Sequence, residues 1–295
     1  MEAILISASD PSDLMNISDP GLPYRFDQVF SAKGFGAKRL EKKRLKLIKE
    51  INPVVQTLLT EGEQVQFVSW GAEYSFVEQY FMGIWAHLIN RRALVFTNRR
   101  ILIIQIDSRR KALKLKTQLR FECIESLAKR TFGYIGFVLR NKKKLFITGI
   151  PRKDRKAIKE MVSSRIQSQS SNAIGLGAGV ENLCPKCGHK VVGFPDRCNQ
   201  CASGFKSARK AGRLSLLFPG LGDLYLGHRG LGSMEIFAGL LSWSFIVLPL
   251  AFGAWAGEND WALTAAVAAG VFFFVHISDF WITRRVGFKG IYPAD

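Results

Sequence analysis

Two long apolar stretches in the C-terminal third of the chain constrain the fold more than any other feature. Residues 231–257 contain a single carboxylate, and residues 261–283 form the second stretch. As a helix, each stretch is long enough to cross the hydrocarbon core of a bilayer, which is about 30 Å thick. Only GEND at 257–260 separates them. The sequence therefore predicts a two-helix membrane hairpin with spans at 232–256 and 261–283.

The charges around this hairpin predict its orientation. Basic residues flank both spans, in KSARKAGR at 206–213 and in RRVGFK at 284–289, whereas the tight turn is acidic. Short segments rich in Lys and Arg stay in the cytoplasm. The mildly acidic start of the chain, MEAILISASD, lacks the pattern of a secretory signal. We therefore expect the protein in the inner (cytoplasmic) membrane of a cell, with both termini in the cytoplasm.

Three ionisable residues fall inside the predicted spans. Glu235 lies about one turn inside the first span, and His276 and Asp279 are three residues apart on one face of the second. The hairpin brings all three to the same leaflet. Ionisable groups within a membrane are functional candidates. The alternative, which we favour, is that they pair with arginines at the interface or reach water.

The segment before the first span, LSLLFPGLGDLYLGHRGLG at 214–232, is apolar but broken by Gly and Pro. Such irregular backbone must be shielded by protein or lie at the membrane interface. The segment resembles the entry of the TM2-type two-helix membrane domains. The residues that carry this resemblance are Pro219, Gly220, Gly222, Asp223, Tyr225, Gly227 and Arg229. We expect His228 and Asp223 to anchor this loop rather than to catalyse a reaction.

Two C-x-x-C pairs contain four of the five cysteines: Cys184, Cys187, Cys198 and Cys201. In a reducing compartment such pairs are metal ligands rather than disulfides, and no thioredoxin-like frame supports a redox motif. Four thiolates suit tetrahedral Zn²⁺ and leave no open position, so the expected zinc ion is structural. Residues 184–201 resemble the zinc-ribbon modules. CPKCG matches their first knuckle, but CNQCASG lacks the Gly that commonly follows the last Cys.

Basic residues dominate the first half of the chain. Lys and Arg number 42 against 24 Asp and Glu, and residues 31–167 hold the whole of this excess. Within this region, apolar and basic residues of 36–59 recur at helical spacing and predict a helix with one apolar and one basic face. Pro53 is expected to kink or split this helix. We expect the apolar face to pack on the protein; the alternative is a helix lying against anionic headgroups. The candidate contacts to an anionic surface are Lys38, Arg39, Lys42, Lys43, Lys46, Arg109, Arg110, Lys111, Lys142, Lys143 and Lys144.

Short β-rich runs follow this helix and are separated by the turn signals TNRR, DSRRK and RNKKK. They lie at 64–70, 93–97, 101–106, 114–124, 134–140 and 144–150, and a helix is predicted at 151–166. This order predicts a small, partly open β-barrel. Through LVFTNRRILII, the strand before it and the helix after it, residues 60–167 resemble the bacterial PH-like domains. The resemblance implies binding of a lipid headgroup or a protein, and we expect TNRR to be an ordinary hairpin turn.

An aromatic-rich insertion, SFVEQYFMGIWAHLIN at 75–90, separates the first two of these strands. It is too short to cross a bilayer as a helix. It can pack on the barrel or lie on the membrane surface, and we expect it to pack on the barrel.

These features predict an α+β multidomain membrane protein that combines a PH-like β-barrel with helices, a small zinc ribbon and a two-helix transmembrane hairpin. The expected divisions are a loose lead-in at 1–35, the basic domain at 36–167, a Ser/Gly linker at 168–181, the ribbon at 182–205 and the membrane part at 206–295.

The expected function is that of a membrane-anchored cytoplasmic adaptor or scaffold that binds anionic lipid headgroups or a protein partner, with homo-oligomer formation left open. No Ser-His-Asp set, P-loop or H-E-x-x-H motif is present, so we expect no enzyme. One alternative is a membrane-tethered nucleic-acid-binding protein, which the basic strands favour but the lack of an interleaved aromatic ladder disfavours. The other is a small-solute transporter component, which would need to form oligomers because two spans enclose no path.

Overall fold

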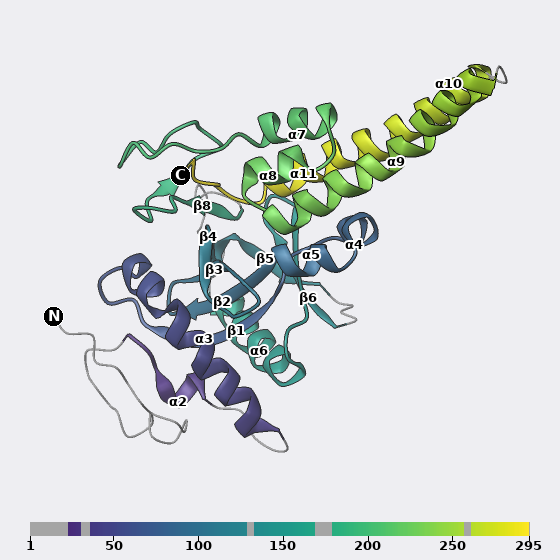
Figure 1. The fold of residues 1–295 in the computed structure, drawn as a ribbon. Helices are drawn as coiled ribbons and strands as arrows, with labels where there is room; N and C mark the ends of the chain where they lie inside the picture. Colours follow the sequence, from purple (N-terminus) through teal and green to yellow (C-terminus); the bar gives the residue numbers. More distant parts are fainter. Residues whose placement is uncertain (1–22, 31–35, 129–132, 169–178, 257–260, 295) are drawn as a thin grey trace. The chain divides into compact units, whose positions relative to one another are not determined.

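The structure is a computed structural model, and it describes residues 23–30, 36–128, 133–168, 179–256 and 261–294. The chain divides into two compact units: unit 1 comprises residues 1–79 and 86–190, and unit 2 comprises residues 80–85 and 191–295. Most of the predicted lead-in and linker, and all of the GEND turn, lie outside the described residues. Figure 1 draws the elements of both units.

The first part of the chain is a mixture of helices and strands. Its helices are α2 (Phe26–Val29), α3 (Ala37–Leu58), α4 (Phe76–Met82), α5 (Ile84–Ile89) and α6 (Arg152–Ser168). Its strands are β1 (Val65–Ala72), β2 (Arg91–Thr97), β3 (Arg100–Ile106), β4 (Ala112–Arg120), β5 (Ile124–Leu127), β6 (Tyr134–Leu139), β7 (Lys144–Thr148), β8 (Glu181–Leu183) and β9 (Lys190–Val191). The predicted mixed α+β class is confirmed.

The strands form one open antiparallel sheet in the order β5-β6-β7-β1-β2-β3-β4-β8-β9. Strands β1 and β7 meet through the single pair Ala72↔Thr148, and the sheet ends at β5 and β9. The structure therefore has an open sheet where we expected a partly open β-barrel. The predicted strand at 114–124 is also two strands, because a 3₁₀ turn at Phe121–Cys123 buries both Phe121 and Cys123 in the core.

Both faces of this sheet are covered in unit 1. The apolar face of α3, including Leu47, Ile51 and Val55, packs in one core cluster with residues of β1, β2 and β3. On the other face, Ile158 and Val162 of α6 join a second cluster. The predicted helix at 36–59 is present with its apolar face buried, but α3 runs through Pro53 without ending there. Packing of that buried face offsets the backbone hydrogen bond that a proline removes.

Unit 2 is helical in the part that follows the cysteines. Its elements are α7 (Ala208–Leu217), α8 (Leu221–Leu226), α9 (Arg229–Ala256), α10 (Trp261–Val271), a π-helical segment (Phe272–Ile277) and α11 (Ser278–Gly287). Left-handed glycines, Gly220 with φ 83° and Gly227 with φ 100°, separate α7, α8 and α9. The expected break in the segment before the first span is therefore present. Gly222 has no room for a side chain, since a Cβ atom there would lie 2.2 Å from the carbonyl oxygen of Ala211.

One helical stretch in the described part of the chain, Ala265–Gly287, is long and apolar enough to cross a membrane. It has 23 residues, and its most apolar window has a mean hydropathy of 1.7 and is only 17% buried inside the protein.

Candidate functional site

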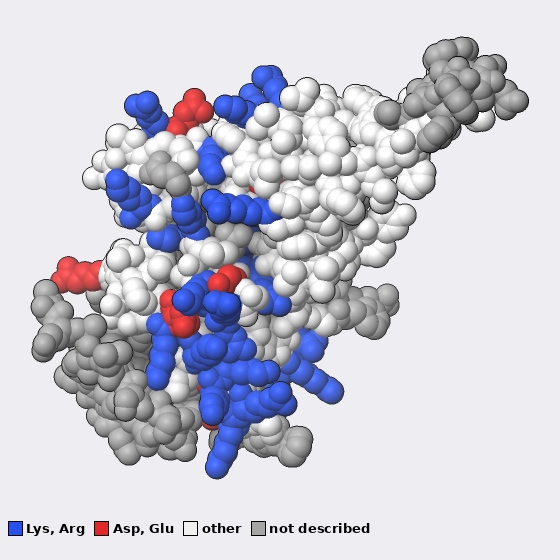
Figure 2. All heavy atoms as spheres, viewed as in Figure 1, with Lys and Arg blue, Asp and Glu red and all other residues white. Residues whose placement is uncertain are grey.

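The basic face of α3 is open to solvent. All five of its predicted surface contacts are exposed: Lys38, Arg39, Lys42, Lys43 and Lys46. On α6, Arg152, Lys153 and Lys156 are exposed as well. Figure 2 shows the Lys and Arg side chains gathered over the region where Figure 1 draws α3 and α6. Unit 1 therefore presents a broad cationic surface, of the kind that attracts polyanions.

A cavity of about 190 Å³ lies in unit 1 at one end of the sheet. Its walls come from segments far apart in the chain: the end of β1, helix α5, the start of β2 and the loop between β3 and β4. The polar and aromatic side chains that line it are Trp70, His87, Arg91, Asp107, Ser108 and Arg110. The cavity is smaller than the roughly 300–1,000 Å³ of sites for drug-sized ligands.

Positive charge is concentrated in this cavity. Burial lowers the pKa of Arg110 below its usual range, and the neighbouring charge of Arg91 lowers it further. The same two causes, burial first and Arg91 second, lower the pKa of His87. Among the described residues, the Arg91 guanidinium forms no hydrogen bond or ion pair. A guanidinium that has no ion-pair partner among the described residues favours an incoming anion.

The other charged groups of the cavity are already engaged. The guanidinium of Arg110 lies 4.8 Å from the ring centroid of Trp70 and donates a hydrogen bond to the carbonyl oxygen of Lys43. The Asp107 carboxylate accepts the backbone N–H groups of Arg109 and Lys111, at 2.8 and 2.9 Å. Asp107 thus holds the β3–β4 loop, and Arg91 is the cation left for a ligand.

The remaining predicted surface residues do not line the cavity. Arg109 and Lys111 are exposed on the same β3–β4 loop. Lys142, Lys143 and Lys144 are exposed at the turn between β6 and β7, where Lys142 pairs with Glu125 at 2.9 Å. Of the sequence candidates, the structure brings only Arg110 to the cavity. Sequence reasoning missed Arg91 and His87, because each looks like an ordinary residue until the four segments are assembled.

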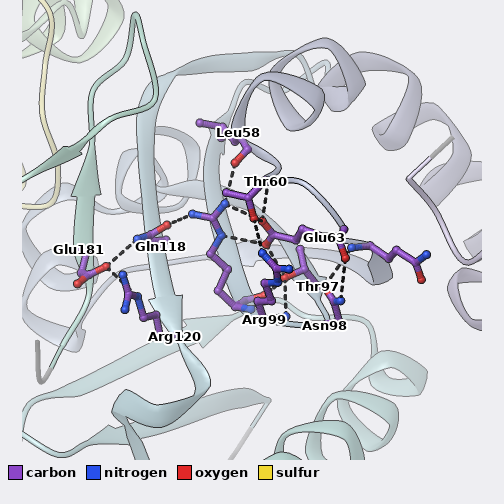
Figure 3. A network of polar contacts seen from close by, with 12 residues as sticks. Leu58, Thr60, Glu63, Thr97, Asn98, Arg99, Gln118, Arg120 and Glu181 are labelled. Atoms are coloured by element: carbon purple, nitrogen blue, oxygen red, sulfur yellow. Dashed lines mark hydrogen bonds and ion pairs between the residues drawn. The ribbon is translucent and has the colours of Figure 1, made fainter. Parts of the chain in front are cut away.

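The TNRR sequence is more than a hairpin turn. Figure 3 shows Thr97, Asn98 and Arg99 in a polar network around Glu63, at the end of α3. Arg100 Nη2 donates to Glu63 at 2.7 Å and to the carbonyl oxygen of Leu58 at 2.7 Å. Burial opposes ionisation of Glu63, yet hydrogen bonds from Arg100, the Thr60 N–H and Thr97 lower its pKa to about 2. This network fixes α3 to the β2–β3 turn.

The same network reaches the strand before the cysteines. Arg100 donates to Gln118 of β4, and Gln118 Nε2 donates to Glu181 of β8 at 2.6 Å. Strand β8 pairs with β4, with Leu183 opposite Lys116. The Lys116 ammonium then donates to the carbonyl oxygen of Pro185 at 2.7 Å. The first cysteine pair therefore begins directly after β8, the strand next to the edge of the sheet.

The four predicted zinc ligands come together. One sulfur from each of Cys184, Cys187, Cys198 and Cys201 lies within 4.8 Å of the others, and none forms a disulfide. Each pair is closed by the same turn: Gly188 N–H donates to the Cys184 carbonyl oxygen and Ala202 N–H to that of Cys198, both at 2.9 Å. Four clustered thiols are a donor set that fits a metal ion such as zinc.

The second cysteine turn contains a backbone conformation that is unusual for its residue. Gly188 after the first pair has φ 71°, and Ala202 after the second pair has φ 56°. The left-handed region costs an L-residue with a Cβ roughly 1–2 kcal/mol. The second turn therefore keeps the same backbone conformation, and Ala202, which stands where zinc ribbons commonly have Gly, is strained.

Carboxylates from three elements of unit 2 form a second cluster. Oxygen atoms of Asp223, Glu235 and Asp279 all lie within 4.8 Å of one another. Thr283 donates to Asp223 at 2.6 Å, and the Gly220 N–H donates to Asp279 at 2.8 Å. Three carboxylates this close repel one another unless a proton or cation neutralises part of their charge. The cluster is therefore able to hold either.

The expectation that Glu235 and Asp279 pair with arginines at the interface or reach water stays a prediction. Asp223, the third acid of the cluster, pairs with His228, with 2.8 Å between Oδ1 and Nδ1, as expected for the loop anchor. One Glu235 oxygen is enclosed without a hydrogen bond in the described part of the chain. His276 is satisfied separately: its Nε2 accepts the indole N–H of Trp243 at 2.8 Å, and its Nδ1 lies 2.9 Å from the Leu216 carbonyl oxygen. Sequence reasoning had grouped His276 with the acids and placed Asp223 only in the preceding loop.

Comparison with known proteins adds no family to this picture. No family model matches the chain, and no curated protein matches it. Among solved structures, the C-terminal domain of an unknown protein from Leishmania infantum aligns at 12% identity over 40% of this chain and 94% of that one, with a TM-score of 0.27. The hSac2 domain of the human phosphoinositide phosphatase Sac2 aligns at 15% identity over 43% and 85%, with a TM-score of 0.29. Similarity this low carries no functional argument.

Proposed function

We propose that this protein is a membrane-anchored adaptor that holds a basic domain against the cytoplasmic leaflet and binds anionic lipid headgroups there. The observation that carries the proposal is the cavity of unit 1, where Arg91 is unpaired among the described residues and Arg110 lies close by. A phosphate group accepts charge-assisted hydrogen bonds from guanidinium groups. The exposed lysines of α3 would add attraction to an anionic surface, at about 1 kcal/mol per residue.

The membrane anchor in this proposal is a two-span hairpin at 232–256 and 261–283 in the inner membrane, with both termini in the cytoplasm. Large apolar side chains of α9 support the first span, because Phe237 is 68% exposed and Phe245 is 70% exposed. Water would make such exposure costly, whereas lipid would not. The apolar stretch Ala265–Gly287 supports the second span.

A structural zinc ion at the four cysteines completes the proposal. Held by Cys184, Cys187, Cys198 and Cys201, it would order the two cysteine turns. In this reading the basic domain is PH-like and the membrane part is TM2-like, and neither contributes a catalytic group.

Binding of short-chain lipids to the full chain in detergent tests this function. Phosphatidylglycerol, phosphatidylcholine, inorganic phosphate and duplex DNA would be titrated separately. We expect phosphatidylglycerol to bind most tightly, and Arg91→Ala to weaken it by about tenfold or more, since a hydrogen bond to a charged group contributes about 1.5–3 kcal/mol. Arg109→Ala removes the same charge outside the cavity and is the matched control.

Two results would contradict the proposal. Equal losses of phosphatidylglycerol affinity in Arg91→Ala and Arg109→Ala would mean that the cavity does not bind the headgroup and that binding depends only on net charge. Tighter binding of duplex DNA than of phosphatidylglycerol would favour the nucleic-acid function instead.

A further inference from the structure

The insertion between β1 and β2 leaves four of its large apolar side chains exposed, while Met82 and Ala86 of the same helices are buried. Phe76 is 83% exposed, Tyr80 75%, Ile84 69% and Phe81 54%. We call these four residues the aromatic ledge. A soluble protein rarely leaves such a contiguous apolar patch uncovered unless it meets a partner or a membrane.

Trp85, the residue after the ledge, connects it to a helix within unit 2. The indole N–H of Trp85 donates to the Met234 sulfur at 3.0 Å. The Trp85 ring also lies against Gly230, where a Cβ atom would be 2.9 Å from the ring. The ledge end at Tyr80–Trp85 therefore lies beside the first turns of α9.

The exposed apolar surface continues along α9 beyond this contact. Met234, Phe237, Leu240 and Leu241 are 45–68% exposed, and Phe245 follows them. The carboxylate of Glu78, the acidic residue within the ledge segment, is turned inward, is 1% exposed and accepts the Ser75 N–H at 2.6 Å. The outer surface of the ledge thus carries no carboxylate. Tyr80 of the ledge and Trp85 beside it are the residue types that gather where a bilayer meets water.

We propose that the aromatic ledge lies in the boundary between headgroups and acyl chains of the cytoplasmic leaflet, as a second contact with the bilayer that does not cross it. The inference rests on the proposed function, because α9 is the predicted first span. We infer lipid as the partner because the ledge adjoins the exposed apolar surface of α9 at Gly230 and Met234. In the proposed function, that surface of α9 meets acyl chains. A segment of this length suits interfacial insertion rather than spanning.

Fluorine NMR of the full, zinc-loaded chain in nanodiscs tests the proposal. A trifluoromethyl-phenylalanine would replace Phe81, Phe245 or Phe137, one at a time. The nanodiscs would contain phosphatidylcholine and phosphatidylglycerol, with a nitroxide lipid labelled near the headgroup or near the acyl-chain end. A water-soluble gadolinium chelate would be the third broadening reagent.

We expect the Phe81 signal to be broadened several-fold more by the shallow nitroxide than by the deep one or by the chelate. Phe245 should be broadened most by the deep nitroxide, and Phe137, which is 1% exposed in the core of unit 1, by none. Broadening of Phe81 only by the chelate would place the ledge in water, and no broadening would place it against protein; either overturns the inference. Broadening of Phe245 by the chelate alone would overturn the proposed span and the ledge together.

Discussion

Arg44 and Asp154, which lie 110 residues apart in the chain, form an ion pair inside unit 1 with 2.7 Å between Nη2 and Oδ1. Their side chains are 0% and 1% exposed. The hydroxyl of Ser69 donates to the second Asp154 oxygen at 2.6 Å, and Arg44 also donates to the Val29 carbonyl oxygen at 2.6 Å. The pair joins α3 to α6, the two helices that carry the cationic surface, across strand β1.

Replacing Asp154 with Ala should destabilise unit 1 by about 3–5 kcal/mol, because it leaves a buried guanidinium without its counter-charge. Hydrogen-exchange mass spectrometry of the full chain should show faster exchange in peptides from α3 and α6. Asp27→Ala is the control, since Asp27 is 65% exposed in its pair with Arg25 and should change exchange little. Unchanged protection of α3 in Asp154→Ala would contradict this role.

Glu63 should make unit 1 sensitive to acid. Its folded pKa of about 2 is below the ordinary value of 4.5, so the ionised carboxylate stabilises the fold above pH 4.5, and that stabilisation is lost as pH falls toward 2. Glu63→Gln should therefore destabilise unit 1 by about 3 kcal/mol at neutral pH and by much less in strong acid. Hydrogen-exchange protection of the β2–β3 peptide, compared between the two proteins at neutral and at acid pH, measures this destabilisation. Glu61→Gln, at an exposed position two residues away, should show no such pH-dependent difference.

Removal of one cysteine ligand should remove the metal. We expect about one zinc per purified chain, and Cys184→Ser or Cys198→Ser should lower this to a small fraction, because three thiolates bind far more weakly than four. Elemental analysis with a chelator-release assay measures it. Cys123→Ser is the matched control, since Cys123 is buried and outside the cluster. Full zinc retention in Cys184→Ser would exclude the site.

Ala202→Gly should tighten the second cysteine turn. The substitution relieves a left-handed conformation at φ 56°, with an expected gain of about 1 kcal/mol. The chelator concentration that removes half of the zinc should rise by about fivefold. Gly188→Ala, the mirror change at φ 71° in the first turn, should lower it. Equal chelator sensitivity in all three proteins would show that these turns do not limit metal retention.

Headgroup binding should strengthen as pH falls. Burial and Arg91 hold the pKa of His87 below its ordinary 6.5, and an anion in the cavity would raise it again, so binding takes up a proton. Affinity for phosphatidylglycerol, whose phosphodiester does not titrate in this range, should rise as pH falls below about 6.5. His87→Gln should flatten this dependence, while His189→Gln, at an exposed position, should keep it. An unchanged slope in His87→Gln would contradict the linkage.

Sequence patterns predicted those helices and strands whose burial repeats regularly along the chain. The helix at 36–59 and most strands follow from apolar spacing, and the cysteine cluster follows from the spacing of its ligands. These predictions succeed because the repeating pattern itself records which face meets the core. The strand at 114–124 failed because Phe121 and Cys123 are buried by a turn, which breaks that pattern.

Features assembled from distant segments could not be predicted in the same way. The cavity needs Trp70, His87, Arg91 and the β3–β4 loop at one place, and none carries a local signal. Likewise, arginines at the interface were the obvious partners for Glu235 and Asp279. The close approach at Gly220 and Gly222 instead brings α8 into the group, and Asp223 with it.

Strand β8 pairs with β4 and ends where the first cysteine turn begins. If the cysteine cluster holds the proposed zinc ion, metal binding and pairing of this strand are linked equilibria, each strengthening the other. A cell short of zinc would release β8, and β4 would then expose a free row of backbone donors and acceptors. Under the proposed function, metal supply would in that way govern whether unit 1 keeps its sheet intact or becomes vulnerable to proteases and self-association.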